Sequence, residues 1–177
     1  MMPVAGMLLV ASPKLTDPNF TRTVVYLLDH GDNGTLGFVL NRPLEVPLRE
    51  LWGEVPPQLA DLRIAAEGGP VDRHKGLLLH RCSDLSGAQP LAEGFAIGGD
   101  LQALAERFAN GIDERGPRLF LGHSGWAPGQ LIAELEEGAW LLRGGRPEQL
   151  LNPQPVATLW QQLLEGRGNG MPDPSRN

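Results

Sequence analysis

Residues 23–40, TVVYLLDHGDNGTLGFVL, carry the clearest secondary-structure signal in this chain. Two runs rich in β-branched and aromatic residues, 23–28 and 35–40, flank the turn-forming segment Asp29 to Gly34, and the Asn33-Gly34 pair is typical of a β-hairpin. Both runs are apolar with little alternation, which indicates strands that are covered on both faces. The stretch therefore predicts a hairpin in the centre of a sheet that has cover on each side.

The segments on either side of this hairpin predict further strands and several helices. Short apolar or β-branched runs predict strands at residues 4–11, 64–67, 76–80, 95–97 and 118–121, and residues 139–142 predict a short strand or a continuation of the helix before them. Apolar residues at helical spacing predict helices at residues 48–52, 101–110, 129–137, 147–151 and 156–165. Asp100 is a suitable N-cap for the helix over 101–110, and Gly111 is a suitable stop. Because strands dominate the first half and helices the second, we expect an α+β (mixed α/β) fold: a largely antiparallel or mixed β-sheet core with helices packed on its faces.

Length, charge and cysteine content limit the classes of protein to consider. The 177 residues fit one domain, expected over residues 1–166 and followed by a disordered polar tail over residues 167–177. The net charge of −6 weighs against binding to nucleic acid or to an anionic membrane. Cys82 is the only cysteine, so no intrachain disulfide can form, which fits a reducing compartment.

The N-terminal residues lack the composition of a targeting signal. The apolar run that ends at Ala11 is preceded by no basic residue, since the first one is Lys14. No run approaches the ~20 apolar residues that a membrane-spanning helix needs. We therefore expect a soluble, cytoplasmic protein that makes no membrane contact.

The segment GHSGW (residues 122–126) is the strongest candidate for chemistry. It is similar to the nucleophile elbow of hydrolases, but Trp126 stands where the second glycine of that motif belongs. Cys82, two residues after His80, is a second candidate nucleophile. A hydrolase or transferase that uses Ser124 or Cys82 is therefore an alternative, although no histidine is singled out as its base. The four histidines have no metal-ligand spacing, and we expect neither a metal nor a cofactor.

Loops at strand ends offer a better candidate for binding. A strand that ends near Gly122 and leads into a helix at Gly129 would expose backbone N–H groups, which can hold an anion. The loops around Asn41, Arg42 and the Gly68-Gly69 pair would complete the same face. The predicted ligand-binding residues are Asn41, Arg42, Gly68, Gly69, His123, Ser124, Gly125, Trp126 and Gly129. Of these, Asn41, Arg42, Gly69, Ser124 and Trp126 are expected to line one cavity.

These residues also have structural interpretations. Arg42 could serve to bond loop carbonyls, and Trp126 could serve as a packing anchor in a strand-to-helix turn. We expect Trp126 and Trp140 to be buried, because they bracket a helix whose apolar stripe faces the sheet. The acidic residues Glu134, Glu136 and Glu137 would form the solvated face of that helix.

The chain resembles the YqgE/AlgH family of bacterial proteins nearly from end to end. The matching stretches are GMLLVASPKLTDPNFTRTVVYLLDH (6–30), GTLGFVLNRPL (34–44), GGPV (68–71), GLLLH (76–80) and GHSGWAPGQLIAELEEGAWLL (122–142). The last is the most specific, because the family pattern G-Y-x-G-W-x-x-G-Q-L is met except at His123, where the family usually has Tyr. His74 and Lys75 also differ from the usual Asp-Arg.

The resemblance implies a compact α/β fold and a cytosolic bacterial protein, and it transfers no catalytic residue. The family carries a transcriptional-regulator label, but the sequence has no helix-turn-helix signature. We therefore expect a non-enzymatic binding or regulatory module that acts through a protein or a small, anionic ligand. A regulator that contacts DNA directly is an alternative, as is the hydrolase or transferase above.

Overall fold

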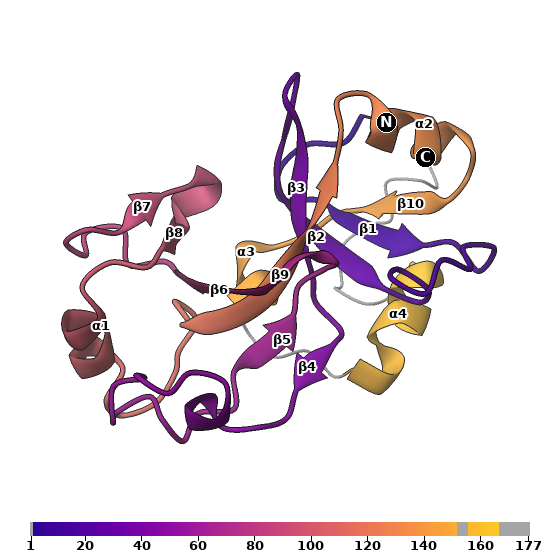
Figure 1. Cartoon of the computed structure of the whole chain (residues 1–177). Helices are drawn as coiled ribbons and strands as arrows, with labels where there is room; N and C mark the ends of the chain where they lie inside the picture. The colour runs from indigo at the N-terminus through magenta and orange to yellow at the C-terminus, as the bar shows by residue number, and fades with distance from the viewer. Residues whose placement is uncertain (1, 152–155, 167–177) are drawn as a thin grey trace.

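The computed structural model describes residues 2–151 and 156–166, and within this part of the chain ten strands form one sheet (Figure 1). The strand order is β10-β1-β2-β3-β9-β6-β8-β7, and β4 and β5 join it because β5 also pairs with β9. The strands are β1 (Leu8–Ala11), β2 (Val24–Gly31), β3 (Gly34–Val39), β4 (Pro43–Leu44), β5 (Ala65–Glu67), β6 (Val71–His80), β7 (Gln89–Pro90), β8 (Ala96–Ile97), β9 (Arg118–Trp126) and β10 (Trp140–Arg143).

Among the described strands, every pairing is antiparallel except the parallel pairing of β5 with β9. The expected α+β fold with a largely antiparallel sheet is confirmed. The β2–β3 hairpin is also confirmed, and its strands extend to Gly31 and Gly34, so that Asp32-Asn33 forms the turn. Gly34 has a φ of +115°. A Cβ there would lie 2.6 Å from the carbonyl oxygen of Trp126 on β9, so the close approach of the two strands requires glycine.

The central strands are buried on both faces, as their continuous apolar runs predict. In β2, Val24, Tyr26 and Leu28 pack into one core cluster, while Val25 and Leu27 pack into another on the opposite face. This is the two-residue alternation of a pleated strand. A third cluster, which includes Leu119 of β9, covers that opposite face at the β5–β9–β6 end of the sheet.

Helices cover both faces of the sheet. They are α1 (Leu101–Arg107), α2 (Gln130–Glu136), α3 (Pro147–Leu151) and α4 (Val156–Leu164), and 3-10 turns occur at Leu48–Glu50 (η1) and Ala92–Gly94 (η2). In Figure 1, α2 and α4 lie on opposite sides of β1 and β10. The side chain of Asp100 accepts from the backbone N–H groups of Gln102 and Ala103, so the predicted N-cap is confirmed.

One predicted loop is a strand. Residues 122–126 were expected to leave the sheet, but they continue β9 as far as Trp126. The following helix α2 spans only Gln130–Glu136, and the side chain of Gln130 accepts from the backbone N–H of Ala127 just before it. The predicted strand-to-helix loop over residues 122–129 is therefore shortened to residues 127–129. The predicted tail, residues 167–177, lies outside the described residues. None of the described helices has the length and apolar character needed to cross a membrane.

Candidate functional site

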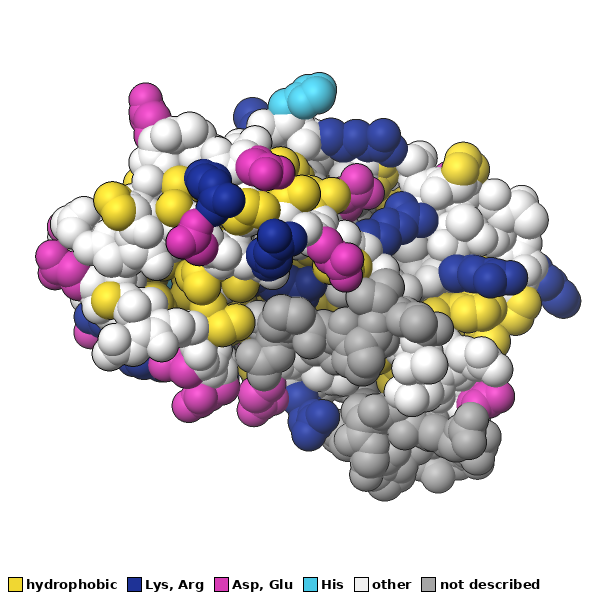
Figure 2. Space-filling view, turned by 90° about the horizontal axis from the view of Figure 1, so that it is seen from below, with side chains coloured by type: hydrophobic (Ala, Val, Ile, Leu, Met, Phe, Trp, Pro, Cys, Tyr) yellow, Lys and Arg dark blue, Asp and Glu magenta, His cyan; other side chains and the backbone are white. Residues whose placement is uncertain are grey.

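A pocket of about 390 Å³ opens between the loop that follows β1 and the strands β5, β6 and β9. We call it the arginine pocket, because Arg42 and Arg73 enter it from separate segments of the chain. Its lining consists of Pro18, Asn19, Arg42, Leu44, Glu67, Gly69, Pro70, Arg73 and Leu121. Seen from below Figure 1, the surface carries Lys and Arg side chains interspersed with acidic and hydrophobic ones (Figure 2).

Arg42 is held in place by neutral acceptors. Its Nη1 donates to the carbonyl oxygen of Asn19 at 2.7 Å, and its Nη2 donates to those of Pro18 at 3.2 Å and Thr21 at 3.4 Å. These bonds fix the loop after β1 as one wall of the pocket. They also orient the guanidinium group without neutralising its charge, because carbonyl oxygens carry only partial charge.

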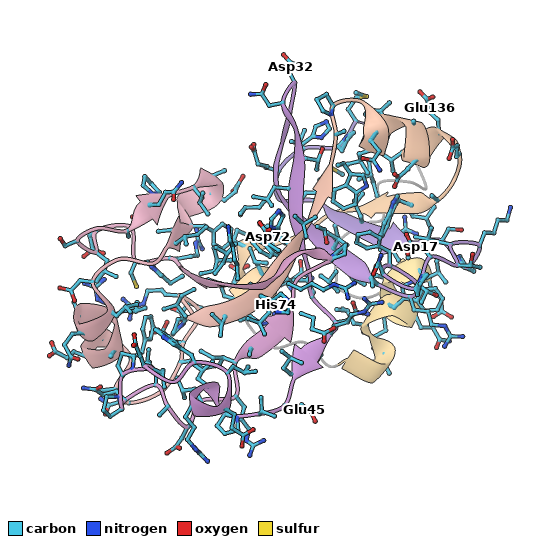
Figure 3. All side chains as sticks on the ribbon, in the orientation of Figure 1. Asp17, Asp32, Glu45, Asp72, His74 and Glu136 are labelled. Carbon is cyan, nitrogen blue, oxygen red and sulfur yellow. The ribbon has the colours of Figure 1, made fainter. Side chains whose placement is uncertain are left out.

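Arg73 reaches the pocket from a large bulge in β6. Val71 pairs with His123 and Gly76 with Leu121, so residues 72–75 stand opposite Gly122 alone. The bulge folds tightly against β9: a Cβ on Gly122 would overlap the carbonyl oxygen of Gly69 and would lie 3.2 Å from the Cα of Arg73. Asp72, with a φ of +52°, begins the bulge, and Figure 3 labels it and His74 where β6 crosses β9. The exposed Arg73 side chain donates to Asn19 Oδ1 at 2.6 Å.

Glu67 brings one negative charge to the same pocket. It ends β5, its side chain is exposed, and no hydrogen bond or ion pair found between described residues involves its carboxylate. The two arginines therefore outnumber the single acidic residue of the lining. The arginine pocket is positive although the chain as a whole carries a net charge of −6.

Of the predicted binding residues, Arg42 and Gly69 line the arginine pocket. Asn41 is next to Arg42 but has a structural role: its Oδ1 accepts from Val24 N and its Nδ2 donates to Arg22 O, both at 2.9 Å. Gly68 is buried, and a Cβ on it would overlap the backbone of Gly122. The structure brings these four residues to one region, and two of them reach the pocket.

The other predicted residues lie elsewhere. His123, Gly125 and Trp126 line a separate open hollow of about 370 Å³ beside the β2–β3 hairpin, and Gly129 lies in the exposed turn before α2. Ser124 is fully buried, and its Oγ donates to Gly68 O at 3.0 Å. The five residues expected to share one cavity are thus divided. The reason is that residues 122–126 continue β9 and form no loop beside Arg42, so Ser124 is buried within the sheet and Trp126 lies opposite Thr35 of the β2–β3 hairpin.

The described geometry pairs neither Ser124 nor Cys82 with a general base. No described hydrogen bond joins Ser124 to a histidine. Cys82 is buried, and its backbone N–H donates to His80 Nδ1 at 3.1 Å, while His80 Nε2 lies 2.8 Å from Gly98 O. His80 Nε2 therefore carries the proton and Nδ1 is occupied, so this imidazole is not free to take a proton from the thiol. Burial, the largest influence, lowers the pKa of His80 and favours its neutral form.

Trp126 and Trp140 form a hydrogen-bonded cluster with Glu134. Glu134 Oε1 accepts from the indole N–H of Trp126 at 3.1 Å and from that of Trp140 at 2.9 Å, and its Oε2 accepts from Gln130 Nε2 at 2.8 Å. Both tryptophans are buried, as expected, and both pack against the ring of Phe20. Glu134 was expected on the solvated face of α2, but its carboxylate turns inward to satisfy both indoles.

Sequence reasoning missed Arg73, Glu67 and Asn19 in the arginine pocket. The usable signal was the polar run Asp72 to Lys75, which directly follows the turn residues Gly68-Gly69-Pro70. This run lies between those turn residues and the predicted strand 76–80, where a bulge can aim side chains away from the ladder.

The fold and this pocket define a small α+β protein with a positively charged cleft at the junction of β5, β6 and β9. The family model described as AlgH-like matches residues 8–171, and the chain belongs to this family. A "UPF0301 protein" of Streptomyces avermitilis is 37% identical over 173 residues, covering 94% of this chain and 88% of that protein. One of Chlorobium luteolum is 35% identical over 166 residues, covering 93% and 86%.

Two solved structures share the fold. A crystal structure of a protein from Corynebacterium diphtheriae superposes with a TM-score of 0.72 at 26% identity, covering 96% of this chain and 90% of that one. The solution structure of the AlgH protein from Pseudomonas aeruginosa superposes with a TM-score of 0.65 at 30% identity, covering 94% and 95%.

Proposed function

We propose that this chain is a non-enzymatic binding module whose arginine pocket takes an anionic group, a carboxylate or a phosphate. The observation that carries the proposal is that Arg42 and Arg73 come from separate segments and line one pocket, while their described bonds go only to neutral oxygens. Guanidinium groups match carboxylate and phosphate geometry, and a charged acceptor makes a stronger bond than a neutral one.

The size and polarity of the pocket fit a small ligand. Its volume of about 390 Å³ lies within the roughly 300–1,000 Å³ that is usual for small-molecule sites. Arg42 is already oriented by loop carbonyls, so little side-chain freedom is lost when an anion arrives. Glu67 would accept from an N–H or O–H group of the same ligand. An acidic side chain of a partner protein would present the same chemistry.

A regulatory role would then be indirect, exerted through the bound ligand or partner. The overall charge of −6 opposes contact with a phosphate backbone. The described geometry also joins neither Ser124 nor the Cys82 thiol to a general base, which favours binding over hydrolysis or group transfer.

Amide NMR titration with inorganic phosphate, acetate and succinate tests the proposal. At least one of these anions should shift the backbone amides of Asn19, Gly69 and Arg73 in a saturable way. Arg73→Gln should weaken that binding about tenfold or more, because one charged hydrogen bond contributes about 1.5–3 kcal/mol. Arg63→Gln is the matched control: Arg63 is exposed, lies outside the pocket and bonds only to Glu45 O among described residues. Binding that is equal in both variants would refute the proposal.

A further inference from the structure

A second hollow adjoins the arginine pocket. This apolar groove, of about 440 Å³, lies between the segment after η1, the strands β6 and β9, and the start of α1. Its apolar lining includes Leu51, Trp52, Leu78, Ile97, Leu101 and Leu119. Leu121 lines both the groove and the arginine pocket, so the two hollows meet at this side chain.

The β6 bulge serves both hollows. Arg73 lines the arginine pocket and the next residue, His74, lines the apolar groove. Gly76, where β6 rejoins its ladder opposite Leu121, leaves the groove open because it has no side chain. One bulge thus borders both hollows: it places a cation at the arginine pocket and leaves the neighbouring groove apolar.

We infer that the ligand of this protein is an elongated amphipathic anion. Its carboxylate or phosphate lies at Arg42 and Arg73, and its apolar part, an acyl chain or an aromatic group, runs past Leu121 into the apolar groove. The inference rests on the proposed function for the anionic end and adds the chemical class of the remainder. The charge arrangement supports it: both arginines are at one end, and the groove has no Lys, Arg, Asp or Glu in its described lining.

The test compares acetate, decanoate and decanol, each below its micelle or solubility limit, by amide NMR and calorimetry. Decanoate should bind at least about 100-fold more tightly than acetate, because burial of a few CH₂ groups at ~0.8 kcal/mol each is sufficient. Decanol should bind more weakly than decanoate. Decanoate should shift amides at both Gly69 and Gly76.

Two substitutions separate the ends of the ligand. Leu51→Gln places a polar group in the groove at a residue that is 38% exposed, so the fold should tolerate it, and it should weaken decanoate about tenfold while acetate is unchanged. Ile112→Gln is the matched control, because Ile112 is 37% exposed and lies outside both hollows. Arg73→Gln should weaken both acetate and decanoate.

Each contrary result has a distinct meaning. If acetate binding depends on Arg73 but decanoate binds no more tightly, the amphipathic ligand is refuted and the proposed function stands. If decanoate binding depends on Leu51 but not on Arg73, the proposed function is refuted along with the anionic end. If sedimentation shows a dimer that Leu51→Gln abolishes, the groove holds a second copy of the chain and the inference is wrong.

Discussion

Replacing Glu134 by alanine should remove a large part of the stability of this protein, although the residue lies on a short helix near the surface. Its Oε1 is the acceptor for two indole N–H groups, those of Trp126 and Trp140. These tryptophans are only 5% and 2% exposed. Alanine leaves both donors in a buried aromatic cluster with no acceptor of their own.

The expected loss follows from these contacts. A hydrogen bond to a charged group contributes about 1.5–3 kcal/mol, and a buried donor left unpaired costs about 1–3 kcal/mol. Losing two such hydrogen bonds with no compensation would cost about twice the amount for one bond. Glu134 is only half-buried, however, so water can enter the space that its side chain leaves and reduce this cost. We therefore expect Glu134→Ala to lower the free energy of unfolding by about 3 kcal/mol, from a total that is commonly about 5–15 kcal/mol.

Urea denaturation followed by circular dichroism measures this loss without relying on tryptophan fluorescence. Glu136→Ala is the matched control, because Glu136 is exposed on the same helix and points away from the molecule in Figure 3. It should change stability by no more than about 0.5 kcal/mol, the range of ordinary surface substitutions. Glu134→Gln keeps one acceptor oxygen and should fall between the two. If Glu134→Ala is as stable as Glu136→Ala, the carboxylate does not hold the aromatic cluster together.

Two further predictions concern pH. Burial lowers the pKa of His80 below its usual 6.5, so the contribution of the neutral imidazole to stability should be complete above pH 6.5 and should be lost as the pH falls below that value. The urea midpoint should therefore drop more steeply with falling pH in wild type than in His80→Gln. Parallel pH profiles of the two proteins would contradict the buried, neutral state of His80. Burial, with a smaller effect of Glu93, raises the pKa of Tyr26 to about 12, so its stabilising contribution should be complete below pH 10 and lost as the pH rises toward 12. Because Tyr26 is the only tyrosine, the phenolate absorbance during a pH titration reports on this residue alone. A titration midpoint near pH 10 in the folded protein would show that the ring is not buried.

The elements that could be predicted from sequence are those with local causes. The hairpin around Gly34 and the helix capped by Asp100 depend on turn and capping chemistry within a few residues. The burial of both faces of β2 follows from an apolar run of β-branched and aromatic residues. Such features are visible in the sequence because the interactions that cause them join near neighbours.

The length of β9 was not predictable, because its glycines have a non-local cause. Gly122 was interpreted as the end of a strand, since glycine usually marks turns. In the structure it lies within β9 and is required because the Gly68-Gly69 backbone and the β6 bulge pack against it. Nothing near Gly122 in the sequence reveals that contact.

The candidate site was half predictable for the same reason. Arg42 was expected because it follows the hairpin and precedes a proline. Arg73 was not, because its position depends on which residues of β6 and β9 pair and where the bulge falls. Trp126 was assigned to the same cavity because a strand was taken for a loop. Residues that meet through strand register can be assembled only once the register is known.

The pairing of β1 with β10 has a consequence for how this chain reaches its native state. The strand Leu8–Ala11 is synthesised early, but its outer partner Trp140–Arg143 is synthesised late, and Trp160 closes over β1 by donating to Ala11 O across 149 residues of sequence. During translation, one edge of β1 therefore stays unpaired until nearly all of the described chain has left the ribosome. Such an apolar edge is prone to association with other chains, and high contact order slows its closure. Expression at high rate or high temperature should favour aggregation, and protection from hydrogen exchange of the β1 amides that face β10 should be among the last to develop on refolding.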